Sequence, residues 1–122
     1  MKAIGKDDSR LPGDWRITDM EYSNEDYSET FLHSFIRIGK KGDGRFQIGL
    51  VAGDIEGKFV REGGGEKFEF GWEKDDEDGY ACGNGWAKAD GKGVLEGEIR
   101  DLGGDWVRFR AKKVKAKGRG AK

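Results

Sequence analysis

Apolar and polar residues alternate through most of the chain between residues 14 and 112, in short segments that glycine-rich turns separate. The clearest segment spans residues 66–74, where Phe68, Phe70 and Trp72 alternate with charged residues. A period of two residues puts every second side chain on the same face of an extended strand. The pattern therefore predicts β-strands that bury one face and expose the other.

The strand pattern predicts a barrel rather than two packed sheets. We expect eight strands, at residues 14–21, 35–40, 45–52, 55–59, 66–74, 80–89, 95–100 and 106–111. All but one of the connections are short, so neighbours in the sequence should be neighbours in the sheet. Antiparallel strands with one apolar face close most economically into a barrel, which leaves no free edge. The predicted fold class is all-β, a single antiparallel up-and-down β-barrel of about eight strands.

Residues 22–34 are the one stretch within this region that does not alternate. Polar residues at positions 23–26 offer helix-capping groups, and Tyr27, Phe31 and Leu32 follow at helical spacing. We therefore expect one short helix between the first two strands, where it would cover one end of the barrel.

Charge is divided unevenly along the chain. Residues 108–122 hold eight of the 23 basic residues and none of the 24 acidic ones, so the part before them carries a net charge of −9. We expect a barrel domain at residues 14–112, between a flexible leader at 1–13 and a basic disordered tail at 113–122. Aromatic residues do not interleave the basic tail, so no specific nucleic-acid site is predicted.

The chemistry-bearing residues do not form a catalytic pattern. The single cysteine, Cys82, excludes an intramolecular disulfide, and the single histidine, His33, leaves no zinc ligand set. A nucleophilic pair of these two residues would lack a third, orienting group. We expect no cofactor and no metal, and an enzyme is the least favoured class. No apolar run is long enough for a signal peptide or a membrane span, so we expect a cytoplasmic protein without a membrane partner.

The opening of the first strand, Gly13-Asp14-Trp15, resembles the calycin superfamily, which includes the lipocalins and avidins. The resemblance implies that Trp15 lies at the floor of the barrel, beneath a basic residue from the last strand. Arg108 and Arg110 are the candidates for that structural role, because a planar guanidinium stacks well on an indole ring.

The body of the chain, residues 13–111, is also similar to a group of small uncharacterised bacterial proteins. The shared motifs are a Trp-Arg-Ile-x-x-Met first strand at 15–20, a Phe-x-Trp followed by acidic residues at 70–78, and Gly-x-Gly-Trp-Ala at 83–87. This resemblance implies a bacterial, cytoplasmic source and no particular activity.

The interior of the barrel is the first candidate site. An eight-stranded barrel is either filled by its own side chains or holds one small ligand. We expect a non-enzymatic binding protein for a small hydrophobic or aromatic molecule, with a filled core as the open alternative. The residues predicted to line the site are Phe46, Phe59, Phe70 and Trp72, and those predicted to close it are Tyr27 and Phe31.

The alternative function is a protein–protein interaction module without an internal cavity. Its candidate surfaces are the acidic loop at residues 73–78 and exposed aromatic residues such as Trp106. The loop does not match a calcium-binding EF-hand, because Lys74 and Gly85 would occupy the first and last ligand positions. A solvated turn that keeps its hairpin soluble is therefore the other interpretation of the acidic loop.

Overall fold

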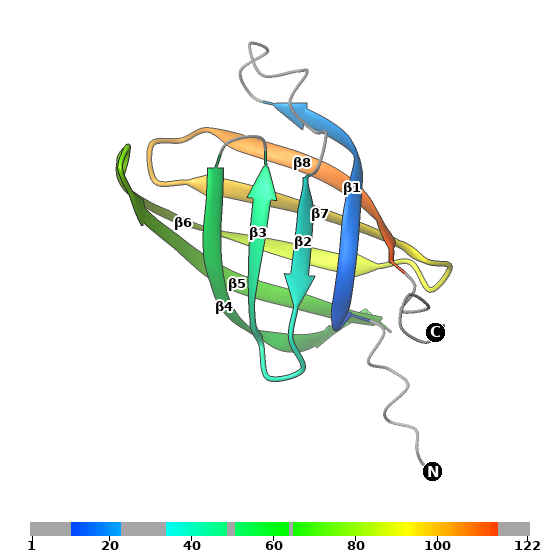
Figure 1. Cartoon of the computed structure of the whole chain (residues 1–122). Helices are drawn as coiled ribbons and strands as arrows, with labels where there is room; N and C mark the ends of the chain where they lie inside the picture. The colour runs from blue at the N-terminus through cyan, green and yellow to red at the C-terminus, as the bar shows by residue number, and fades with distance from the viewer. Residues whose placement is uncertain (1–10, 23–33, 49–50, 64, 115–122) are drawn as a thin grey trace, which may run out of the picture.

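The chain folds into a closed antiparallel barrel (Figure 1). The computed structural model describes residues 11–22, 34–48, 51–63 and 65–114. The strands follow one another around the barrel in sequence order, and β8 pairs with β1. They are β1 (Gly13–Tyr22), β2 (Phe35–Ile38), β3 (Asp43–Ile48), β4 (Val51–Glu62), β5 (Gly65–Asp76), β6 (Gly79–Ala89), β7 (Val94–Asp101) and β8 (Trp106–Lys113).

The predicted fold class is confirmed, because the barrel is all-β, closed and in up-and-down order. The short helix was predicted within residues 22–34, of which 23–33 lie outside the described residues, as do most of the predicted leader and tail. Within the described ranges, no helix is long and apolar enough to cross a membrane.

The inner face carries the alternation that the sequence predicts. Phe68 and Phe70 on β5 are buried at 0% and 5% exposure. Inward-facing glycines on the neighbouring strands leave room for the ring of Phe70: a Cβ atom on Gly57 would lie 2.6 Å from the Cβ of Phe70, and one on Gly85 would lie 2.6 Å from its ring. Glycine inside a strand often marks such a close approach. The side chain of Phe70 therefore packs against Gly57 on β4 and Gly85 on β6.

The β5–β6 hairpin is longer than the wall on either side of it. The last partner of β4 on β5 is Glu73, and the last partner of β7 on β6 is Gly83. The ladder between β5 and β6 continues to the pair Asp76 and Gly79. Residues 74–81 therefore project beyond the paired wall as the end of a two-stranded hairpin, at the left of Figure 1, and the carbonyl of Cys82 at its base accepts the N–H of Leu102 in the β7–β8 turn at 3.2 Å.

Candidate functional site

The aromatic residues predicted to bind a ligand gather inside the barrel. The rings of Phe46 and Trp72 meet edge to face, with centroids 5.4 Å apart. Phe68 links Phe59 and Phe70, with centroids 5.0 Å and 5.3 Å away. All of them are buried except Phe59, which is half-buried. These rings thus contact one another as parts of the core.

Tyr27 and Phe31, the residues predicted to close the site, lie outside the described residues. Binding of a small hydrophobic molecule inside the barrel therefore stays a prediction.

Trp15 is buried near the N-terminal end of β1. Its side chain is 2% exposed, and its indole Nε1 donates to the carbonyl oxygen of Leu11 at 3.0 Å. The amine of Lys113 lies 4.8 Å from the centroid of the indole and donates to the carbonyl of Pro12 at 2.8 Å. Burial lowers the pKa of this amine, and the nearby charge of Asp14 opposes that shift.

The assignment of Arg108 or Arg110 to Trp15 is wrong. In β8, Phe109 and Ala111 are buried in the core, so the intervening arginines face outward. Lys113 continues the inward series and pairs directly with Trp15 in the β1–β8 ladder. The basic residue beside Trp15 does come from the last strand, but it is Lys113, on the inward side of β8, and not one of the outward-facing arginines.

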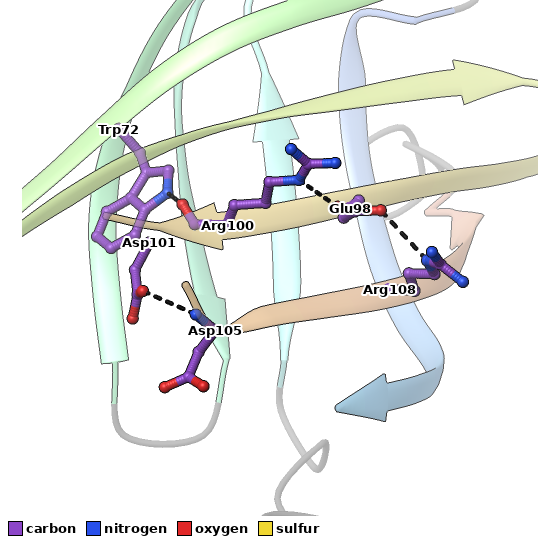
Figure 2. Close-up of polar contacts among 6 residues, drawn as sticks. All are labelled: Trp72, Glu98, Arg100, Asp101, Asp105 and Arg108. Carbon is purple, nitrogen blue, oxygen red and sulfur yellow. Dashed lines mark hydrogen bonds and ion pairs between the residues drawn. The ribbon is translucent and has the colours of Figure 1, made fainter. Parts of the chain in front are cut away.

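Arg108 belongs instead to a cluster with Glu98 and Arg100 on the outer face of β6, β7 and β8, and Arg110 pairs with Glu96 on the same face. At the centre of the cluster is Glu98, whose side chain is only 6% exposed although it faces away from the core. Arg108 on β8 and Trp86 on β6 lie directly across from Glu98 in the two ladders. Arg100 lies two positions along β7. Figure 2 shows the Glu98 carboxylate between the two arginines.

Both arginines donate Nε to Glu98, Arg108 to Oε1 at 3.2 Å and Arg100 to Oε2. The hydrogen bond from Arg100, together with that from Arg108, lowers the pKa of Glu98, whereas burial acts in the opposite direction. The carboxylate is therefore charged at neutral pH. We call Glu98, Arg100 and Arg108 the arginine clamp.

The clamp presents free hydrogen-bond donors to solvent. The side chains of Arg100 and Arg108 are 59% and 57% exposed. Their Nε atoms are used by Glu98, whereas their terminal Nη groups have no hydrogen-bond acceptor among the described residues. A guanidinium carries five N–H donors in a planar fork. Each arginine therefore keeps its outer edge available to an anionic group.

Three local features hold the clamp in place. The guanidinium of Arg108 stacks over Trp106 on the same strand, 4.7 Å from the ring centroid. The indole of Trp72 donates to the backbone carbonyl of Arg100 at 2.9 Å from inside the barrel (Figure 2). In the β7–β8 turn, Asp101 accepts the backbone N–H of Asp105 at 3.1 Å, which helps to set the register that places Arg108 opposite Glu98.

A groove of about 650 Å³ borders the clamp on the outer wall. Its outward-facing lining comes from β1, β6, β7 and β8 and comprises Asp19, Glu21, Trp86, Glu96, Glu98, Arg108 and Arg110. Glu96 and Arg110 form an ion pair at 3.7 Å and are both more than half exposed. The groove thus combines one aromatic ring with charged side chains of both signs.

The acidic loop is partly neutralised from within its own hairpin. Lys74 donates to Asp76 at 2.9 Å and to the carbonyl of Gly79 at 3.1 Å. The hydrogen bond from Lys74 lowers the pKa of Asp76. Farther up the hairpin, Glu73 accepts the hydroxyl of Tyr80 at 3.1 Å. The turn is thus organised by local hydrogen bonds.

Cys82 is half-buried beside Tyr80, and their hydrogen bond, with that to Glu73, raises the pKa of Tyr80 to about 12. His33, which was considered with Cys82 as a nucleophilic pair, lies outside the described residues. In the part of the chain that the structure describes, no three His, Cys, Asp or Glu residues are placed to hold a metal ion.

The clamp was not among the sites predicted from the sequence. One signal for it was present: the short turn at 102–105 aligns Glu98 with Arg108, and Arg100 follows two residues after Glu98 on the same face. The chain was also compared with protein-family profiles, with curated proteins and with solved structures, and none of them matches.

Proposed function

We propose that this protein is a non-enzymatic binding module that recognises an acidic segment of another protein through the outer face of β6, β7 and β8. The observation that carries the proposal is the arginine clamp. Its carboxylate, on Glu98, faces the outer wall of the barrel and yet is largely shielded from water. The side chain of Glu98 is 6% exposed, whereas that of Glu96, on the same face of β7, is 55% exposed.

Burying a carboxylate is unfavourable unless strong hydrogen bonds compensate for the lost hydration. Glu98 has two such bonds, and their effect is to restrict Arg100 and Arg108 before any partner arrives. Binding by side chains that are already ordered loses less conformational entropy. The clamp is therefore arranged like a preorganised recognition site.

The composition of the face also suits protein recognition. Tryptophan and arginine are the residues most enriched among those that dominate binding energies at interfaces. Here Trp86 and Trp106 flank the clamp, and both are partly exposed. Free guanidinium edges select carboxylates, with which they form bidentate hydrogen bonds. An acidic partner segment is the class of ligand that this chemistry favours.

Binding of a small hydrophobic molecule inside the barrel is the second candidate. It is favoured by the presence of Phe46, Phe70 and Trp72 in the barrel core, with Phe59 packed against it. Against it, a ligand among these rings would have to separate pairs whose centroids lie 5.0–5.4 Å apart. The outer face requires no such rearrangement, so it ranks first.

The test is a selection of random peptides on the immobilised full chain, followed by titration of the enriched peptides. We expect acidic peptides that bind Arg108→Ala and Trp86→Ala at least about 10-fold more weakly than the wild type, because interface residues of these types commonly contribute more than 1.4 kcal/mol. Arg45→Ala is the control, because Arg45 is half exposed and ion-paired to Asp54 on another wall.

Enrichment without acidic residues, or equal binding by all three variants, would contradict the proposal. Quenching of tryptophan fluorescence by a panel of small aromatic and aliphatic molecules examines the second candidate independently. Saturable quenching that Phe46→Ala or Trp72→Phe abolishes would place the ligand inside the barrel instead.

A further inference from the structure

We infer that a second copy of this chain supplies an acidic segment of this kind: the tip of the β5–β6 hairpin, residues 75–78, docks on the arginine clamp of a neighbouring molecule. This inference rests on the proposed function, because it assigns a partner to the same clamp. It is carried by the shape of the hairpin, by its unneutralised charge and by its distance from its own clamp.

The hairpin has the shape of an inserting element. Its β5 strand extends three residues beyond the last partner on β4, from Lys74 to Asp76. At about 3.3 Å per residue, that projection is about 10 Å long. Neither β4 nor β7 pairs with the projection, and the β7–β8 turn contacts its base, where the N–H of Leu102 donates to the carbonyl of Cys82 at 3.2 Å. Its tip is therefore free to enter a groove on another molecule.

The tip carries charge that its own hairpin leaves uncompensated. Lys74 pairs with Asp76, but Asp75, Glu77 and Asp78 are exposed and their carboxylates have no hydrogen-bond or ion-pair partner among the described residues. The clamp offers two guanidinium groups whose Nη atoms have no hydrogen-bond acceptor among the described residues. The groove beside the clamp is also lined by Asp19, Glu21 and Glu96, so the attraction comes from the two guanidinium groups themselves and not from the net charge of the face.

The tip does not reach the clamp of its own molecule. Arg100 lies opposite Asn84, five residues along β6 from Gly79 at the base of the turn. That separation is about 17 Å along a paired strand. The ladder from Asp76 to Gly79 and the bond between Tyr80 and Glu73 keep the hairpin straight. Contact between tip and clamp is therefore intermolecular.

Such a contact joins two different surfaces, so each molecule contributes one tip and one clamp. Contacts of this kind close as a reciprocal pair or as a ring, or they continue as a filament. Exposed ion pairs contribute little individually and are screened by salt. The association should therefore be weak, salt-sensitive and dependent on concentration, and it would compete with any other acidic partner for the clamp.

Sedimentation velocity of the full chain tests this inference with two complementary variants. The tip variant, Asp75→Lys with Glu77→Lys, keeps the clamp. The clamp variant, Arg100→Gln with Arg108→Gln, keeps the tip. We expect the wild type to associate at low salt and to dissociate at high salt, each variant alone to be monomeric, and an equimolar mixture to form heterodimers.

The control variant, Asp43→Lys with Glu56→Lys, makes the same change in net charge at exposed positions on β3 and β4. It should associate as the wild type does. A monomeric wild type at low salt, or association that the tip variant retains, would overturn the inference. In that case, acidic peptides that still bind the clamp would show that the proposed function stands without self-association. If acidic peptides also fail to bind, both the proposed function and this inference are refuted.

Discussion

Glu98→Gln is the sharpest perturbation of the arginine clamp. The substitution keeps the volume and shape of the side chain and removes its charge. An amide can accept a hydrogen bond from one arginine through its oxygen, but its NH₂ group then faces the donor of the other. One of the two contacts that Glu98 makes with Arg100 and Arg108 is therefore lost, and the other is weakened.

The magnitude follows from the exposure of the partners. A hydrogen bond to a charged group contributes about 1.5–3 kcal/mol, but the recovered hydration of Glu98 and of two arginines that are more than half exposed offsets much of this. We expect a loss of about 1–2 kcal/mol in the free energy of unfolding at neutral pH. With a slope near 2 kcal/mol per molar, the urea midpoint would fall by about 0.5–1 M.

The pH dependence gives this prediction a second arm. Folding lowers the pKa of Glu98 below its ordinary value of 4.5. A carboxyl group with a depressed pKa stabilises the fold above the pKa of the unfolded state, and this contribution is lost as the pH falls through the folded-state pKa. The glutamine does not titrate. The gap between wild type and variant should thus be full at pH 7 and shrink below about pH 4.5.

Urea unfolding followed by tryptophan fluorescence measures both arms, and Glu96→Gln is the matched control. Glu96 faces the same side of β7, but it is 55% exposed and 3.7 Å from its arginine. Its substitution should change stability by less than about 0.5 kcal/mol. If Glu98→Gln behaves like Glu96→Gln, or if its effect is the same at pH 3 as at pH 7, Glu98 does not hold the arginines by its charge.

Three further predictions concern the barrel and its hairpin. Trp15→Ala should reduce the free energy of unfolding by about 3–5 kcal/mol in urea melts, since the ring is 2% exposed. In the same assay, Gly57→Ala should be destabilising by about 1–3 kcal/mol, because its Cβ would lie 2.2 Å from a backbone oxygen, whereas Gly71→Ala, whose Cβ meets nothing within 3.7 Å, should be tolerated. Ultraviolet titration should give Tyr80 a pKa of about 12, and Cys82→Ala should bring it closer to 10.0.

The architecture was predictable because the inner face repeats one simple rule. From Phe68 to Trp72 in β5 every second residue is apolar, and the register then follows from short turns that join consecutive strands. The end of that hairpin was placed less well. Residues 75 and 76 are both acidic, so the alternation stops at Lys74 while the backbone pairing continues to Asp76. Hydrogen bonds between strands do not require an apolar side chain, which is why the projection was missed.

Trp15 shows how a correct motif can be completed by the wrong residue. Arginine was preferred because of its planar guanidinium, but the parity of β8 decides which side chains face inward. Phe109 and Ala111 are inward, so Lys113 is too, and Arg108 and Arg110 are not. Chemical preference for a partner is thus a weaker guide than strand parity.

The clamp could not be predicted from the pattern of one strand, because it depends on three strands and on the interior. An outward glutamate on β7 reads as a solvated residue until the ladders place Trp86 on one side and Arg108 on the other. From within, the indole of Trp72 fixes the backbone of Arg100. A side chain predicted to hold a ligand thus has a second role as a support for the outer wall. Strand β7 therefore belongs both to the core and to the proposed recognition face. Packing inside the barrel sets how firmly the arginines outside it are held.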